Sequence, residues 1–141
     1  MADPIYPADS KWTVLKSTYR GKPMYVRRNE SARALLGHKD YRHRIGVAVA
    51  VYRPAEDGLP DSEDFEALAG VEDSLCTLLE KDQLSLLVLA ITTGGMREFV
   101  FYARDAAAAS HVKELRVLFP DRKITSYVAE DSEWELYSQF S

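Results

Sequence analysis

The chain has 141 residues, the length of one ordinary domain, and its hydrophobic share of 46% and charged share of 28% exclude an intrinsically disordered chain. No apolar run reaches the roughly 18–20 residues that a membrane span needs, and the single cysteine excludes an internal disulfide. The formal net charge of −4 argues against a general nucleic-acid binder.

The amino-terminal part of the chain predicts a β-hairpin. Residues 12–19 are rich in β-branched and aromatic residues, and residues 24–28 alternate again after the turn-forming Gly21-Lys22-Pro23. The proline suggests a position at the edge of a sheet, because proline cannot donate a ladder hydrogen bond. Residues 29–41 are polar and ambiguous, with room for one helical turn.

The middle of the chain alternates strands and helices. Residues 45–52 are almost continuously apolar, which predicts a central strand, and a proline-bounded loop follows at 54–60. Asp61 can cap a helix that extends to Lys81, because apolar residues recur there at spacings of three and four. The later predicted elements are strands at 84–93, 96–104 and 124–128, a helix at 106–119 capped by Asp105, and a short acidic helix with a capping box at 132–135.

After the hairpin, the predicted order is β-α-β-β-α-β. Two right-handed crossovers around a central hairpin produce an antiparallel four-stranded sheet with both helices on one face. The expected fold is therefore an α+β, ferredoxin-like sandwich with an added amino-terminal β-hairpin and a short carboxy-terminal helix. Residues 1–11 are expected to be a tail, and 12–141 a single domain.

Charge is distributed unevenly along the chain. Up to residue 53 there are 11 basic and 4 acidic residues, and from residue 54 there are 7 basic and 18 acidic ones. Three explanations stay open: ion pairing within one fold, patches that face a protein partner such as a second copy, and a phosphate-binding stripe. The cations of such a stripe would be Arg27, Arg28, Arg33, Lys39, Arg42 and Arg44.

Other short motifs favour structural roles over chemistry. Gly94-Gly95 is typical of a tight hairpin turn, since a strand and not a helix follows it. Cys76 falls near the apolar stripe of a helix and is expected to be an inert thiol. The three histidines have no carboxylate at a metal-ligand spacing, so no metal site is expected. The acidic pairs are adjacent residues that point apart on a helix or lie in loops, so no catalytic dyad is expected.

The aromatic residues Phe99, Phe101 and Tyr102 follow Arg97 on one predicted strand. In RNA-recognition modules of this topology, aromatics on central strands stack on exposed bases. Here the glycine between the arginine and the first aromatic is absent, and Glu98 adds negative charge. A packed core strand is the favoured interpretation.

Four strings of the sequence stand out: 12–19, Gly58-Leu59-Pro60, the most specific stretch ITTGGMREFVFY at 91–102, and the aromatic and acidic residues at 127–137. With them the chain resembles a family of uncharacterised bacterial proteins, domain of unknown function 695, over most of its length. This resemblance implies no activity and no catalytic residues. A looser likeness, in topology, in the acidic loop at 56–64 and in the late aromatics, is to the family of regulator B of ribonuclease E activity, which acts by binding its target.

We therefore expect a non-enzymatic interaction or regulatory module that binds a protein and has no cofactor. We expect it to be cytoplasmic, because the amino terminus lacks a signal-peptide pattern. One alternative is an RNA-binding protein that uses residues 27–44. Another is a small-molecule-binding domain or enzyme with a cleft between hairpin and sheet, where the polar groups would be Tyr19, Tyr25, Arg27 and His43. The candidate binding residues are Arg27, Arg28, Arg42, His43 and Arg44.

Overall fold

The structure, a computed structural model, describes residues 6, 7, 9–52 and 54–140. Its centre is one antiparallel sheet of six strands in the order β1-β2-β4-β5-β3-β6. The strands are β1 (Trp12–Tyr19), β2 (Lys22–Asn29), β3 (His43–Ala50), β4 (Ser85–Thr93), β5 (Met96–Ala103) and β6 (Ile124–Glu130). The helices are α1 (Ser62–Leu79), α2 (Val112–Leu118), α3 (Glu135–Ser138) and the 3-10 helices η1 (Glu30–Leu35), η2 (Lys81–Gln83) and η3 (Ala106–His111).

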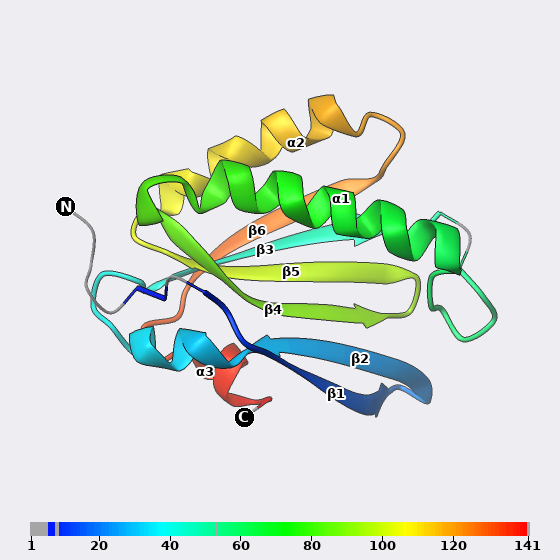
Figure 1. The fold of residues 1–141 in the computed structure, drawn as a ribbon, viewed down its shortest axis with the longest axis horizontal. Coiled ribbons are helices and arrows are strands. Elements are labelled where there is room, and N and C mark those ends of the chain that lie inside the picture. Colours follow the sequence, from blue (N-terminus) through cyan, green and yellow to red (C-terminus); the bar gives the residue numbers. More distant parts are fainter. Residues whose placement is uncertain (1–5, 8, 53, 141) are drawn as a thin grey trace.

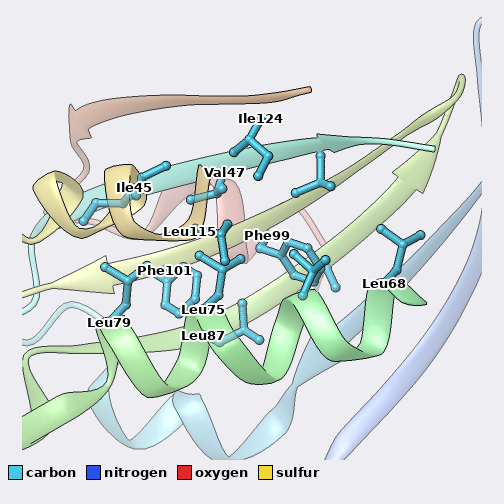
Figure 2. Close-up of a cluster of buried hydrophobic side chains, with 14 of the residues drawn as sticks. Ile45, Val47, Leu68, Leu75, Leu79, Leu87, Phe99, Phe101, Leu115 and Ile124 are labelled. Carbon is cyan, nitrogen blue, oxygen red and sulfur yellow. The ribbon is translucent and has the colours of Figure 1, made fainter. Parts of the chain in front are cut away.

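Helices α1 and α2 lie side by side over one face of the sheet (Figure 1). Leu68, Leu75 and Leu79 of α1 and Leu115 of α2 point toward the strands (Figure 2). They meet a layer of strand residues that all belong to one buried cluster, including Ile45, Val47, Leu87, Phe99 and Phe101. Burial of this layer supplies the main stabilisation of the domain, since apolar area removed from water contributes roughly 25 cal/mol per Å².

The opposite face of the sheet is covered by η1 and the carboxy-terminal segment, which form a second apolar cluster. At its centre the ring of Trp134 stacks on Tyr102, with centroids 4.2 Å apart and planes 7° from parallel. The indole nitrogen of Trp134 donates a hydrogen bond of 2.7 Å to the carbonyl of Tyr41. Both faces of the central strands are therefore buried, although only one carries long helices.

The predicted hairpin forms, but its turn is shorter than expected. Arg20 and Gly21 occupy the turn with positive φ of 52° and 80°, and Pro23 already belongs to β2. The hairpin lies at one edge of the sheet, as expected, but β1 is the outermost strand and β2, which carries the proline, lies between β1 and β4. Pro23 is tolerated because β4 pairs with β2 only from Tyr25 onward.

Two predicted helices differ in their details. Residues 106–119 split into η3 and α2, and the helix ends at Leu118, because Phe119 precedes a proline and adopts φ −128° and ψ 67°. The expected capping by Ser132 is wrong. Trp134 precedes α3 in a left-handed conformation, and Asp131 accepts hydrogen bonds from the backbone N–H groups of Glu135 (2.8 Å) and Leu136 (3.3 Å) instead.

The other element boundaries move by one or two residues. Strand β3 begins at His43 and β6 continues to Glu130, because these two residues pair with each other at the end of the ladder. Residues 1–5 and 8 of the predicted tail at 1–11, together with residues 53 and 141, lie outside the described residues. In the part of the chain that is described, no helix has the length and apolar character to cross a bilayer.

Candidate functional site

The structure distributes the five predicted binding residues over three places. Arg27 and Arg28 are neighbours on β2 and point to opposite faces of the sheet, as alternate residues of a strand must. Arg27 makes a two-pronged ion pair with Glu72 of α1, at 2.7 and 3.0 Å, and Arg28 donates to Glu30 at 2.7 Å.

Arg42, His43 and Arg44 lie at the other end of the sheet, at the start of β3. Arg44 donates to Asp131 at 2.8 Å, and the hydroxyl of Tyr102 donates to the same carboxylate oxygen at 2.7 Å. Much of the basic segment is therefore paired inside the molecule, and the predicted residues do not form one site.

Arg42 instead lines an open hollow of about 380 Å³ with Lys39, Asp40 and Arg104. The guanidinium of Arg104 is held by the hydroxyl of Tyr41 at 2.9 Å and lies 3.7 Å from the carboxylate of Asp40. This hollow is a shallow, cationic part of the surface with one carboxylate and no apolar wall among its lining residues.

A different group of side chains is brought together on the helix-covered face. Tyr25 of β2 is paired with Thr92 of β4, and Thr92 is paired with Arg97 of β5. Side chains directly opposite in antiparallel strands lie about 5 Å apart on the same face. The three residues therefore form a polar row across three strands.

This row forms the floor of a pocket of about 270 Å³. Phe65, from the first turn of α1, and Leu59 and Pro60, from the loop before it, supply the apolar walls. Phe65 is 56% exposed, so this wall of the pocket is open to solvent. The pocket combines an apolar wall with convergent polar groups, the arrangement typical of small-ligand sites.

Arg97 is the distinctive residue of the pocket, because it is a buried cation without a counter-ion. It is 7% exposed, and its Nε donates a hydrogen bond of 2.7 Å to the hydroxyl of Thr92. Its guanidinium carbon lies 5.3 Å from the centroid of Phe65. Burial first, and then repulsion from Arg27, lower the pKa of Arg97, but arginine stays charged at any physiological pH. No carboxylate of the described residues forms an ion pair with it.

The carboxylates nearest to Arg97 are already engaged with other arginines. Glu72 is paired with Arg27, and Asp64 accepts a hydrogen bond of 2.6 Å from Arg122. Burial tends to raise the pKa of Asp64, but the hydrogen bonds from Arg122 and from the backbone of Tyr52 outweigh it, so the pKa is lowered. Asp64 is therefore an anion fixed by its own partners, and it leaves the terminal amino groups of Arg97 without a carboxylate.

The rim of the pocket depends on a close contact between two turns. Gly95 donates a backbone hydrogen bond of 2.9 Å to the carbonyl of Gly58. A side chain at Gly58, which has a φ of +86°, would come within 3.0 Å of the backbone of Gly94 and Gly95. Glycine is therefore required for the loop that carries Leu59 and Pro60 to dock on the β4–β5 turn.

The aromatic residues considered for base stacking are not available in this fold. Phe99 and Phe101 are fully buried beneath the helices, and Tyr102 is covered by Trp134. The core-strand interpretation is confirmed. Burial and the neighbouring Glu80 raise the pKa of the Cys76 thiol, as expected for a residue with little nucleophilic thiolate. Among the described residues, no three His, Cys, Asp or Glu side chains form a group that could hold a metal ion.

Comparison with known families decides the classification of the chain. The sequence profile of the family of unknown function DUF695 matches residues 10–141. The chain belongs to this family. No curated protein matches the sequence. The family resemblance seen in the sequence strings is thereby confirmed, and it assigns no activity.

Two of the four strings that carry the DUF695 resemblance meet at the pocket. Four of the six lining residues come from them: Leu59 and Pro60 from one string, and Thr92 and Arg97 from another. Sequence reasoning found Tyr25 but missed Arg97, Thr92 and Phe65. The hairpin turn at Gly94-Gly95 was a usable signal, because a two-residue turn there sets Thr92 opposite Arg97.

The cleft proposed from sequence is corrected in its composition. Tyr25 lines the pocket and Arg27 lies beside it, but Tyr19 lies at the end of the hairpin with 51% exposure and His43 lies at the opposite end of the sheet. The six lining residues offer one cation, two hydroxyl groups and three apolar side chains. Such a set can bind and orient an anion, and it contains no nucleophile with an adjacent base.

Proposed function

We propose that the protein is a small-molecule-binding domain that takes up a small organic anion in the pocket lined by Arg97. The single observation that carries the proposal is the buried guanidinium of Arg97, which has an acceptor at Nε and no carboxylate partner among the described residues. A buried charge without a partner costs free energy, and a ligand of opposite charge that pairs with it removes that cost.

The charges around the pocket support an anionic ligand. Among the described residues, three arginines and two carboxylates interact beside α1: Arg27, Arg97, Arg122, Glu72 and Asp64. Three cations and two anions leave one positive charge, located at the pocket. An anion bound there would balance this charge in a region where water screens it poorly.

The proposal is tested by thermal unfolding in a panel of sodium salts at constant ionic strength, with benzoate, acetate and inorganic phosphate as probes. An anion at ten times its Kd stabilises a protein by about 1.4 kcal/mol, which corresponds to about 4 °C in a domain of this size. We expect at least one probe to raise the Tm of the wild-type protein by this amount and to have no effect on Arg97→Gln.

The matched control is Arg116→Gln, which removes an exposed arginine on α2, next to β6 at the far end of the sheet. It should respond to the anions as the wild-type protein does. The proposal would be wrong if every probe shifted the Tm of Arg97→Gln as much as that of the wild-type protein.

The fold is proposed to be ferredoxin-like with an added hairpin. Support comes from the chain order β3-α1-β4-β5-α2-β6, from the sheet order β4-β5-β3-β6, and from the two helices on one face. This fold hosts many unrelated functions, so it does not by itself favour any activity.

A protein partner and a cytoplasmic location stay predictions. The structure weakens the argument for a protein partner that the basic segment provided, because Arg27 and Arg44 pair with acidic residues of the second half of the chain. The exposed Lys39 and Arg42 are what supports an RNA or protein partner, and a salt-sensitive complex lost in the double variant Lys39→Gln/Arg42→Gln would identify one.

A further inference from the structure

We infer that the anion is a monocarboxylate attached to a compact apolar body, such as a small aromatic acid. This inference rests on the proposed function and specifies the chemical class of the ligand. Three properties of the pocket point to it: its charge balance, the free edge of the Arg97 guanidinium, and its apolar walls.

The charge balance favours an ion of charge −1. Glu72 and Asp64 are each paired with another arginine, so a single positive charge remains at Arg97. A carboxylate neutralises that charge, whereas a phosphate monoester carries about −1.5 to −2 at pH 7. The excess negative charge of a phosphate would have no partner in a buried place, where unpaired charge is costly.

The free edge of Arg97 matches a planar carboxylate. Nε is occupied by the hydroxyl of Thr92, and the ring of Phe65 covers one side of the guanidinium. Because the N–H bonds lie in the plane of the guanidinium, an anion that accepts hydrogen bonds from it approaches in that plane, at the two terminal amino groups. Those two groups donate in parallel, and a carboxylate accepts both hydrogen bonds at once.

The walls and the volume describe the rest of the ligand. Leu59, Pro60 and Phe65 offer only carbon to a bound molecule. A volume of about 270 Å³ lies just below the usual range for drug-sized ligands, roughly 300–1,000 Å³. A body of the size of a benzene ring fits these limits, and acetate would leave the apolar walls without contacts.

The test is a titration at pH 7 and constant ionic strength with four probes: benzoate, benzyl alcohol, phenyl phosphate and acetate. Binding is followed by backbone amide NMR shifts of the wild-type protein, Arg97→Gln and the control Arg116→Gln. We expect benzoate to bind at least tenfold more tightly than the other three probes, and at least tenfold more weakly to Arg97→Gln. Its shifts should centre on Tyr25, Thr92 and Arg97, which tests the location even if the variant fails to fold.

Each contrary outcome has a distinct meaning. Phenyl phosphate binding as tightly as benzoate, with dependence on Arg97, would overturn the carboxylate and leave the proposed function standing. Acetate or benzyl alcohol matching benzoate would overturn the apolar body or the requirement for charge. If no anion bound in an Arg97-dependent way and no shift centred on the pocket, both the inference and the proposed function would fall.

Discussion

Arg97 and Arg122 are both buried arginines beside α1, but they differ in their hydrogen-bond and ion-pair partners. Arg122 donates to Asp64 and to the carbonyl of Ala50, at 2.6 and 2.9 Å, and it stacks on Tyr52. Arg97 has one hydroxyl acceptor and an open pocket beside it. Arg122 is therefore paired with a carboxylate inside the fold, whereas the charge of Arg97 has no carboxylate partner among the described residues.

This contrast predicts opposite effects of substitution on stability. Arg97→Met should stabilise the ligand-free protein by about 1 kcal/mol, because it removes a desolvated charge that has no ionic partner. Arg122→Met should destabilise it by about 3 kcal/mol, because it leaves the buried carboxylate of Asp64 unpaired. Urea unfolding measures both values. A loss of stability in Arg97→Met as large as that in Arg122→Met would mean that Arg97 is a structural residue.

The different roles of Arg97 and Arg122 cannot be recognised from the sequence around them. In the sequence, Arg97 stands out only as the neighbour of an aromatic string, in which Phe99 and Phe101 are core residues. Nothing in a local pattern says whether a buried arginine finds a carboxylate, because its partner comes from another element. Here the candidates come from α1, more than twenty residues away along the chain.

At the scale of elements, helix α1 positions much of the pocket wall. Asp61 caps it by accepting a hydrogen bond of 2.8 Å from the backbone N–H of Asp64. Phe65 and Asp64 follow in its first turn, so the cap fixes both the pocket wall and the partner of Arg122. The acidic first turn also suits the positive end of the helix dipole.

Loss of this cap should therefore affect both stability and binding. Asp61→Ala is expected to lower the free energy of unfolding by about 1 kcal/mol, the usual value for an N-cap. It should also weaken benzoate binding, because Phe65 moves with the first turn. Glu66→Ala, an exposed change in the same helix, serves as the control and should be neutral. Denaturant unfolding and the benzoate titration measure the two effects, and unchanged values for Asp61→Ala would contradict the role of the cap.

The long, strongly periodic elements were predicted well, and the ambiguous ones were not. The amphipathic stripe of α1 and the apolar strands β3, β4 and β5 follow from side-chain period alone. The segment that became η1 has no such period, and it forms a 3-10 helix because Ala32 and Leu35 are buried against the second face of the sheet. Tertiary packing decided the conformation there.

At the scale of the whole molecule, Asp131 ties the carboxy-terminal segment to the sheet. Its carboxylate accepts hydrogen bonds from Arg44 of β3, from Tyr102 of β5 and from the first backbone N–H groups of α3. Burial tends to raise the pKa of Asp131, but these hydrogen bonds together hold it below its ordinary value. One side chain thus connects two strands and the segment that covers them.

Asp131→Asn should cost about 2 kcal/mol of stability at pH 7, because Arg44 loses its counter-ion and fewer acceptors remain. A lowered carboxyl pKa stabilises the fold above the unfolded value of about 3.9, and this contribution is lost as the pH falls through the folded pKa. The difference between wild type and variant should therefore shrink below about pH 4. Near-UV circular dichroism of the stacked Tyr102 and Trp134 reports the transition.

Glu133→Gln is the matched control, since that carboxylate is exposed and lies only two residues from Asp131 in the sequence. It should leave both the midpoint and its pH dependence unchanged. Equal behaviour of the two variants, or a wild-type advantage that persisted at pH 2, would contradict the role given to Asp131.

The sequence by itself determined the long strands and the long helix, the turn at Gly94-Gly95, the buried character of the aromatic strand and the membership of the DUF695 family. These features depend on local period, turn chemistry and motif strings. Only the tertiary structure decided which charges meet. It paired Arg27 with Glu72 and Arg44 with Asp131, and it left Arg97 without a carboxylate beside an apolar wall. Ion pairing and pocket shape depend on distances between side chains from elements that lie far apart in the sequence, and no local pattern encodes those distances.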